Sequence, residues 1–366
     1  MNRRPPVRAT GRAARAWDGV AGSAAAAVLV VDPLDIRWLT GFSGSAGVVV
    51  LGPRPVLVVD GRYADQAEEQ VAASGCAADV VVAAQGSTPD DEAVRLVGGA
   101  VGFDPAATTV ARAARWRAAG APELVEVGGF AGLRMVKEPD EIALIEEAAA
   151  IADRALALTG VVPGATETEI RNRLEESMRG EGADGPGYGT IVASGPNAAL
   201  PHHRPTAREV RHGDAVVVDV GAEVDGYRSD MTRTLGVGGI DPILASWWGI
   251  VAEAQEAGVA AVRPGATGDE VDRAVRRVLE RHGVDEWFVH GTGHGVGLAI
   301  HEGPWLRRGS RDVLEEGMVV TVEPGLYRKG LGGVRIEDLL VVTRTASRHL
   351  TRSPKDEPCP RSAPTT

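Results

Sequence analysis

The sequence has few cysteines and no excess of positive charge, and each shortage excludes a class of protein. Its two cysteines, Cys76 and Cys359, cannot form a disulfide framework in 366 residues, and neither has a partner at zinc-ligand spacing. Acidic residues outnumber basic ones by 50 to 39, and the resulting net charge of −11 argues against a protein that neutralises nucleic-acid phosphates. We therefore expect a cytoplasmic protein without a nucleic-acid partner.

Long apolar runs are also missing. No stretch approaches the roughly 18 consecutive apolar residues of a membrane span, so we expect no membrane partner. Several arginines precede the apolar stretch from Ala24 to Val31, as in a secretory signal, but Asp18 interrupts the pattern and no A-x-A cleavage site follows. We interpret this stretch as a buried β-strand.

The length predicts two domains of the α/β (α+β) class. The first half alternates apolar segments typical of strands, such as 28–31, 48–51 and 56–59, with a helical pattern over 64–74. A long amphipathic helix is predicted to begin near Pro139 and to open the second domain. We predict a smaller N-terminal domain over 20–130, a catalytic domain over 137–353 and a disordered, proline-rich tail over 354–366.

The second half contains an internal repeat. The segment 162–170 recurs as 263–271, with each position shifted by 101 residues. Both copies hold a threonine, Thr166 or Thr267, followed three residues later by glutamate, which is the capping box that starts a helix. Two such units related by pseudo-symmetry would place a site on the seam between them.

Histidines and strand carboxylates locate the chemistry in this second half. None of the eight histidines precedes His202, and seven lie between His202 and His301. Four carboxylates lie on predicted strands rich in apolar residues, where a buried charge is costly unless it is paired or bound to a cation. Each carboxylate taken singly is better explained by a salt bridge or a helix cap, but all four beside a histidine cluster indicate a metal site. The four are Asp219, Asp230, Glu323 and Glu337.

The types of ligand narrow the choice of metal. Four carboxylates with one imidazole form an oxygen-rich set that suits Mn²⁺, Mg²⁺, Fe²⁺ or Co²⁺ better than a tetrahedral zinc site. Four carboxylates are also more than one ion needs, and they could bridge two ions about 3.5–4 Å apart.

The sequence does not match three other functional motifs that it partly resembles or that are common in enzymes. The glycine-rich segment 291–297 does not match G-x-G-x-x-G, and we expect its glycines to let the backbone pass close to a bound group beside His294. The segment starting at His301 begins like H-E-x-x-H but carries Pro304 and ends in Trp305. The sequence also lacks G-x-S-x-G, the commonest serine-hydrolase signature.

Together these segments resemble a known family, the M24B metallopeptidases, which form the Xaa-Pro aminopeptidase and prolidase branch of the methionine-aminopeptidase-like pita-bread fold. The N-terminal segments 35–42 and 60–63 resemble the creatinase-type domain of that branch. The matching blocks of the second half are 191–202, 218–234, 290–304, 323–325 and 333–338.

The resemblance implies roles for individual residues. It implies two divalent ions, with Mn²⁺ favoured and Co²⁺ as the alternative, and attack by a hydroxide that bridges them on the carbonyl before proline. Glu323, besides binding metal, would shuttle a proton to the leaving nitrogen. The implied metal ligands are Asp219, Asp230, His294, Glu323 and Glu337. The implied residues around the substrate are His202, His290, His301 and Arg335, whereas His203 does not match the family pattern.

The resemblance leaves the substrate open between two kinds of peptide. A dipeptidase must bind the substrate's free carboxylate, ideally through arginine, whereas an aminopeptidase must leave room for a longer peptide. Arg307, Arg308 and Arg311 could supply that arginine or could form a solvated loop. We favour the Xaa-Pro aminopeptidase, with the Xaa-Pro dipeptidase (prolidase) as the alternative. A catalytically inactive binding protein and a creatine-type amidinohydrolase are disfavoured because no metal ligand is lost; a homodimer is implied by the resemblance alone.

Overall fold

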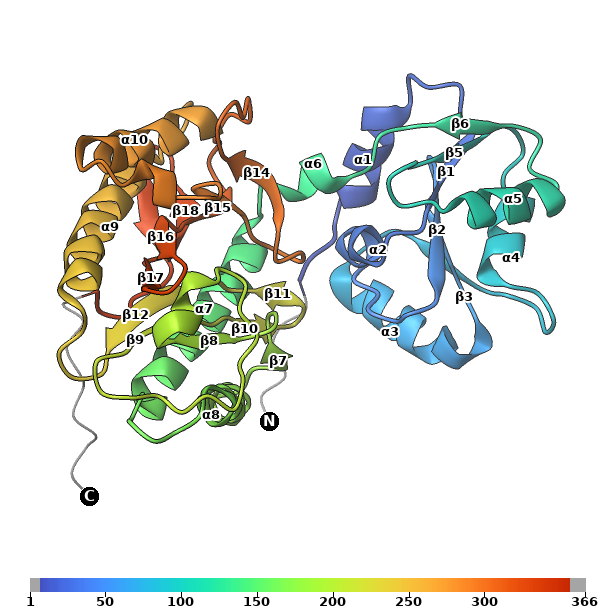
Figure 1. Ribbon diagram of the computed structural model, residues 1–366. Helices are drawn as coiled ribbons and strands as arrows, with labels where there is room; N and C mark the ends of the chain where they lie inside the picture. The colour runs from blue at the N-terminus through green and yellow to red at the C-terminus, as the bar shows by residue number, and fades with distance from the viewer. Residues whose placement is uncertain (1–6, 356–366) are drawn as a thin grey trace. The chain divides into compact units, whose positions relative to one another are not determined.

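The computed structural model describes residues 7–355 (Figure 1). Contacts within the chain divide it into two units, with the break between Arg134 and Met135. Most of the predicted tail, residues 356–366, lies outside the described residues. Pro354 and Lys355 are described, and both are hydrogen-bonded to the second unit, so the prediction of a tail that begins at 354 is wrong for these two residues.

The N-terminal unit is built on one mixed sheet with the strand order β4-β3-β2-β1-β5-β6. The three central strands, β3, β2 and β1, are antiparallel, and the outer pairs are parallel. Apolar side chains of strands and helices form its core around Leu29, Val58 and Trp116. The expected strands and the expected helix over 64–74 are all present. The elements are α1 (Arg12–Val20), β1 (Ala27–Val30), α2 (Pro33–Thr40), β2 (Gly47–Leu51), β3 (Val56–Val59), η1 (Gly61–Tyr63), α3 (Ala64–Ser74), β4 (Asp79–Val82), α4 (Pro89–Leu96), β5 (Val101–Phe103), α5 (Val110–Ala118), β6 (Leu124–Glu126) and α6 (Ala131–Arg134).

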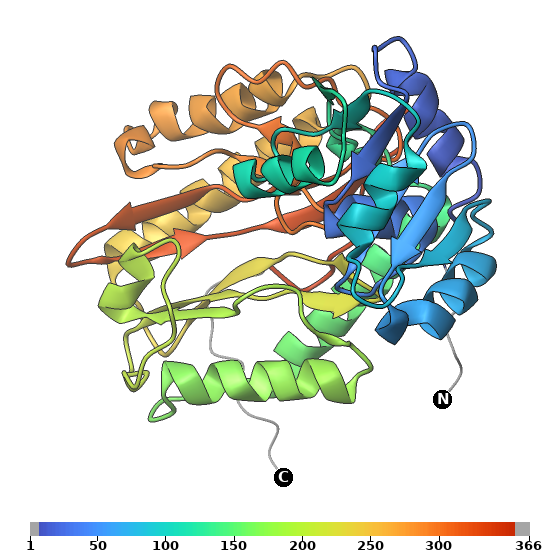
Figure 2. The same ribbon diagram turned by 90° about the vertical axis from the view of Figure 1, so that its right-hand side faces the viewer.

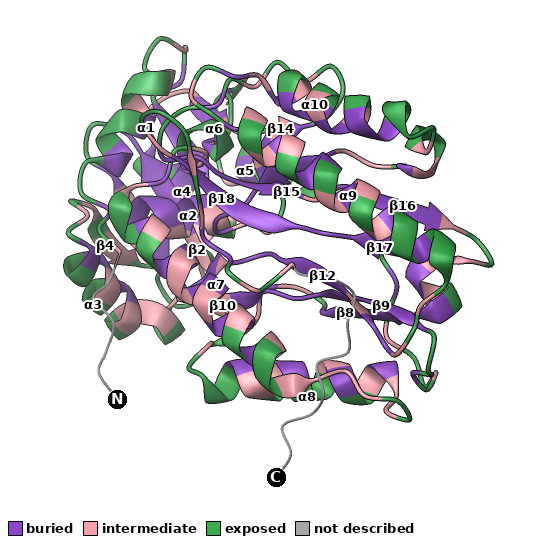
Figure 3. Cartoon of the chain, turned by 90° about the vertical axis from the view of Figure 1, so that its left-hand side faces the viewer, coloured by how far each residue is buried: buried purple, intermediate pink, exposed green. Residues whose placement is uncertain are grey.

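The second unit contains two helix pairs on the outside of its strands (Figures 2 and 3). Helices α8 and α10 begin at the two copies of the repeat, and in each the threonine and the glutamate form the predicted capping box. The outer sides of these helices carry exposed residues (Figure 3), while apolar residues such as Ile170 and Val275 are buried. The helices are α7 (Pro139–Thr159), α8 (Glu167–Gly180), α9 (Pro242–Ala261) and α10 (Gly268–Arg281), with short turns η2 (Gly195–Ala199) and η3 (Asp285–Trp287).

The strands between the helix pairs form several small antiparallel sheets. Strand β9 pairs with β12 in antiparallel fashion and places Asp219 opposite Thr232. A five-stranded sheet in the order β14-β13-β15-β18-β19 follows the second copy of the repeat in the chain. The strands are β7 (Gly185–Pro186), β8 (Ile191–Ser194), β9 (Ala215–Asp219), β10 (Ala222–Val224), β11 (Tyr227–Arg228), β12 (Thr232–Gly236), β13 (Gly293–Gly295), β14 (Glu302–Leu306), β15 (Val319–Val322), β16 (Gly325–Arg328), β17 (Gly332–Arg335), β18 (Asp338–Val342) and β19 (Ser347–His349).

The glycines around His294 let neighbouring backbone segments of this sheet approach closely, and Gly291 and Gly293 also line the pocket described below. A Cβ on Gly293 would lie 2.0 Å from the carbonyl oxygen of Thr321, and one on Gly295 would lie 2.1 Å from that of Gly303. The neighbouring backbones thus approach too closely for any side chain. Among residues 7–355, no helix is both long and apolar enough to cross a bilayer.

Candidate active site

The four predicted carboxylates lie at or beside strand ends of the second unit. Asp219 is the last residue of β9, and Asp230 lies just before β12. Glu323 directly follows β15, and Glu337 lies between β17 and β18. The prediction that all four carboxylates lie on strands is therefore correct for Asp219 alone. The other three lie in irregular backbone beside a strand, where the ends of several strands can come together.

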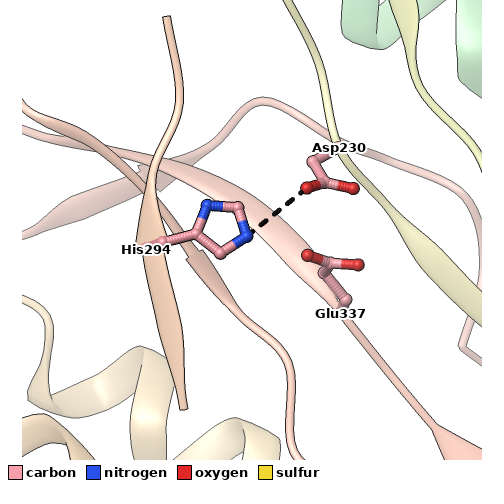
Figure 4. A group of neighbouring side chains, drawn as sticks. All are labelled: Asp230, His294 and Glu337. Carbon is pink, nitrogen blue, oxygen red and sulfur yellow. Dashed lines mark ion pairs between the residues drawn. The ribbon is translucent and has the colours of Figure 1, made fainter. Parts of the chain in front are cut away.

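Three of the predicted metal ligands come together into one buried group. Asp230, His294 and Glu337 each offer an atom within 4.8 Å of the others (Figure 4). The Nε2 atom of His294 lies 3.6 Å from Asp230 Oδ2 and 3.4 Å from Glu323 Oε1. The remaining acid, Asp219, is connected to Asp230 through a tyrosine described below, so all five predicted ligands belong to one cluster.

Burial and mutual repulsion make this cluster of acids costly to ionise. Burial raises the pKa of Asp230 well above its usual value, and the charge of Asp219 raises it further. Burial, followed by the charge of Glu337, likewise raises the pKa of Glu323. The pKa of Glu337 is raised by burial and by the nearby acids. A divalent cation relieves such repulsion, so the donor set fits the oxygen-rich metal site expected from the sequence.

His294 presents a neutral imidazole to the acids. Burial lowers its pKa to about 4, so the imidazole is uncharged near pH 7. Its Nδ1 atom donates to the carbonyl oxygen of Gly295 at 3.0 Å, which fixes the tautomer and leaves the Nε2 lone pair directed at the acids.

Tyr188 is a site residue that the sequence analysis missed. Its hydroxyl donates to Asp219 Oδ1 and lies 2.5 Å from Asp230 Oδ1. Burial, followed by the charges of the two aspartates, raises its pKa well above 10, so the phenol keeps its proton. One neutral donor thus connects two acids that would otherwise repel each other.

Arg335 and Tyr327 connect the acids to His290. The Arg335 guanidinium contacts Asp219 Oδ2 at 2.6 Å and donates to the Tyr327 hydroxyl at 3.0 Å. That hydroxyl lies 3.0 Å from His290 Nε2, while His290 Nδ1 donates to the carbonyl oxygen of Gly291. Burial lowers the pKa of His290 to about 4, so the imidazole is neutral near pH 7 and its Nε2 atom accepts a hydrogen bond from the Tyr327 hydroxyl. Sequence analysis also missed Tyr327.

All nine predicted site residues line one pocket of about 500 Å³ in the second unit. His301 faces His294 edge to face, with ring centroids 4.4 Å apart, and burial followed by the nearby His202 lowers the His301 pKa. Of the three arginines considered above, Arg307 lines the pocket, and Arg308 and Arg311 do not. A second arginine, Arg204, lines it as well and was not predicted.

A buried acid also supports the segment that carries His290 and His294. Asp272 of α10 accepts from the Thr292 hydroxyl at 2.8 Å and from Arg276 Nε at 2.7 Å. Arg276 in turn donates to the carbonyl oxygen of His290 at 2.8 Å. Helix α10 thereby fixes the backbone from which both histidines project.

Comparisons with known proteins agree with this fold and donor set. The model of metallopeptidase family M24 matches residues 143–344, and that of the creatinase/prolidase N-terminal domain matches residues 12–136. An uncharacterized peptidase of Bacillus subtilis is 40% identical over 337 residues, which are 90% of this chain and 94% of that protein. The structure of an Xaa-Pro dipeptidase from Bacillus anthracis is 37% identical, with a TM-score of 0.92 over 96% of this chain and 100% of the other. An X-Pro aminopeptidase from Thermotoga maritima is 30% identical, with a TM-score of 0.86 over 95% and 99%.

The fold and the cluster of acids and histidine define a metal-dependent peptidase with a pita-bread catalytic unit. The chain belongs to metallopeptidase family M24 and carries the creatinase-type N-terminal domain of its prolidase-like members.

Proposed function

We propose that this peptidase hydrolyses Xaa-Pro dipeptides at the bond before proline. The observation that carries this proposal is the presence of two arginines, Arg204 and Arg307, on the wall of the pocket that holds the acids. A dipeptide presents its free carboxylate close to the scissile bond, and arginine is suited to bind it. The greater identity to the B. anthracis dipeptidase, 37% against 30% for the aminopeptidase, supports the same choice. The sequence alone had favoured the aminopeptidase.

Asp219, Asp230, His294, Glu323 and Glu337 would hold two divalent ions, for which Mn²⁺ is our first choice and Co²⁺ the second. When bound, such ions polarise a carbonyl and lower the pKa of water. Neutral His294 suits this role because its free Nε2 faces the acids.

The remaining residues would act on the substrate. Glu323 combines a half-buried carboxylate of raised pKa with a place on the pocket wall, so it can take up a proton and pass it to the leaving proline nitrogen. His202 and His301 lie on the pocket wall and can donate hydrogen bonds to the developing oxyanion. His290 is held by Tyr327 and Gly291 and lines the pocket beside them.

The test is hydrolysis by metal-stripped protein, with and without added Mn²⁺ or Co²⁺, of Ala-Pro, Ala-Pro-Ala and Ala-Ala. Metal-dependent cleavage of Ala-Pro with little cleavage of the tripeptide is the expected result. Cleavage of Ala-Pro-Ala at the first bond with comparable kcat/KM would instead establish the aminopeptidase. Cleavage of Ala-Ala at the rate of Ala-Pro would refute the proline preference.

The aminopeptidase is the second candidate because Arg204 and Arg307 are both exposed and could move aside for a longer peptide.

We also propose a homodimer in the cytoplasm, on the strength of the family resemblance. Sedimentation of the purified protein tests the dimer, and fractionation of the source cells tests the compartment.

A further inference from the structure

Glu167, the first residue of α8, is fully buried and accepts six hydrogen bonds from described residues. Its Oε1 atom accepts from the backbone N–H and hydroxyl of Ser194, both at 2.8 Å, and from Asn197 Nδ2 at 3.0 Å. Its Oε2 atom accepts from His203 Nε2 at 2.8 Å and from the Thr206 backbone N–H and hydroxyl at 3.0 and 2.7 Å. Every group around this carboxylate is a donor.

These donors lie along one segment, residues 194–206, and occur at both of its ends. The segment contains His202, which faces the pocket, and Pro201, whose carbonyl oxygen accepts from Arg335 at 3.2 Å. His203, next to His202, points its Nε2 at Glu167. The two neighbouring histidines thus have different partners: His203 contacts the buried acid, and His202 lines the site.

Helix capping does not account for Glu167. Thr166 and Glu169 already form the capping box of α8. In the second copy of the repeat, the position that corresponds to Glu167 is Gly268, where a Cβ would lie 2.1 Å from the carbonyl oxygen of Trp305. The capping box is therefore common to both copies, whereas a buried acid at the first position of the helix occurs only in the copy that carries His202.

We propose that Glu167 is a positioning residue for catalysis, which holds the segment 194–206 so that His202 faces the substrate. This inference rests on the proposed function, because it assigns His202 a part in the reaction. Glu167 itself does not line the pocket and acts through the segment it binds.

The charge of Glu167 is part of this arrangement. Burial alone would raise its pKa, but the hydrogen bonds from His203, Asn197, Ser194 and Thr206 outweigh burial and lower the pKa to about 2. Replacement by glutamine would exchange one acceptor oxygen for an N–H₂ group, which would then face hydrogen-bond donors of the segment 194–206. The substitution Glu167→Gln should therefore loosen one end of the segment while nearly preserving the volume of the side chain.

A double-mutant cycle on kcat with Ala-Pro tests the proposal, using Glu167→Gln, His202→Ala and the combination. A misplaced catalytic group costs up to about 100-fold, so we expect Glu167→Gln to lower kcat by about 10- to 100-fold with a much smaller change in KM. In the His202→Ala background the same substitution should lower kcat by less than about threefold, because residues that act together are not additive. Equal losses in both backgrounds would overturn the proposal.

Glu169→Gln is the matched control, since Glu169 lies on the same helix, is exposed, and is hydrogen-bonded to the capping threonine rather than to the segment 194–206 in the described structure. We expect its kcat to equal that of the wild type. A comparable fall in both glutamine variants would overturn the proposal, because it would trace the effect to the helix rather than to the segment. Should Glu167→Gln not fold, His203→Gln removes only the contact next to His202 and enters the same cycle.

A second readout does not depend on activity. In protein labelled at its histidine rings, we expect the imidazole NMR signals of His202 to shift in Glu167→Gln and to stay in place in Glu169→Gln. An unchanged His202 signal in Glu167→Gln would refute the inference. If the wild type cleaves no Xaa-Pro peptide while the His202 signal shifts as expected, the proposed substrate fails and the positioning of His202 by Glu167 stands.

Discussion

The hydroxyl of Tyr188 lies between Asp219 and Asp230 and donates to both acids, with its oxygen 2.5 Å from Asp230 Oδ1. A phenol has one proton, so the two carboxylates share it. Since burial, followed by the charges of the two aspartates, raises the pKa of Tyr188 well above 10, the hydroxyl keeps its proton near pH 7 and remains a donor. Tyr188 therefore orients two of the proposed metal ligands while contributing no charge.

Tyr188→Phe should weaken ion binding without removing a ligand. Loss of a hydrogen bond to a metal ligand typically costs about 10- to 100-fold in metal affinity or activity. Calorimetric titration of metal-stripped protein with Mn²⁺ measures the change, and Tyr63→Phe in the N-terminal unit, which removes a hydroxyl bonded to Ser45, is the control. Equal Mn²⁺ affinity in Tyr188→Phe and the wild type would show that the hydroxyl does not orient the ligands.

Tyr188 and Tyr327 also show the limit of what the sequence could predict about the site. The acids drew attention because charged residues beside valine-rich strands need a partner, a rule that applies to each residue locally. A single tyrosine in a glycine-rich segment carries no such signal. Its importance depends on which strand ends meet, and that is decided by long-range packing.

The local features of the fold could likewise be predicted from the sequence, whereas its long-range contacts could not. The capping boxes at Thr166 and Thr267 are local, so both helix starts were correct. The docking of Lys355 was not predicted, because it depends on the buried carboxylate of Asp338, 17 positions away in the sequence, and on Gln255 of α9.

Divalent ions should stabilise the protein, and more strongly at higher pH. The pKa values of Asp230, Glu323 and Glu337 are raised, so the folded metal-free protein keeps protons that the unfolded chain loses above about pH 4 to 4.5. The stability of the metal-free protein therefore falls as the pH rises above that point. A bound ion takes the place of these protons, so it stabilises the folded protein more strongly at higher pH.

Thermal melts with EDTA or with Mn²⁺ at pH 5, 6 and 7 measure this effect. At a free ion concentration about 100 times Kd, the gain is about 2.7 kcal/mol, or several degrees in Tm. We expect the gain to grow from pH 5 to pH 7 and to disappear in His294→Ala. A gain that is constant across this range would indicate that the acids are already ionised in the metal-free protein.

Arg307→Ala should separate the two candidate substrates. If Arg307 binds the dipeptide carboxylate, its loss raises KM for Ala-Pro by about tenfold and leaves the KM for Ala-Pro-Ala unchanged, because a charge-assisted hydrogen bond contributes about 1.5–3 kcal/mol. Arg308→Ala is the control, since Arg308 follows it in the sequence and lies outside the pocket lining. An equal rise in KM for both peptides would mean that Arg307 contacts a part they share. The same comparison with Arg204→Ala determines which arginine binds the carboxylate.

The stability contributed by Glu167 should depend on pH in a defined direction. Its folded pKa of about 2 lies below the ordinary value of 4.5, so the contribution is fully present above pH 4.5 and is lost as the pH falls toward 2. The shift corresponds to about 3 kcal/mol at pH 7, of which about 1 kcal/mol is lost by pH 3.5.

Urea unfolding of the wild type and of Glu167→Gln at pH 7, 5 and 3.5 measures this contribution. We expect the difference in unfolding free energy between the two proteins to be nearly equal at pH 7 and pH 5 and to shrink at pH 3.5. Glu169→Gln, whose carboxylate is exposed at the capping box, should change stability only slightly at each pH. A difference for Glu167→Gln that stays constant down to pH 3.5 would show that shape, rather than the charge of the carboxylate, holds the segment that carries His202.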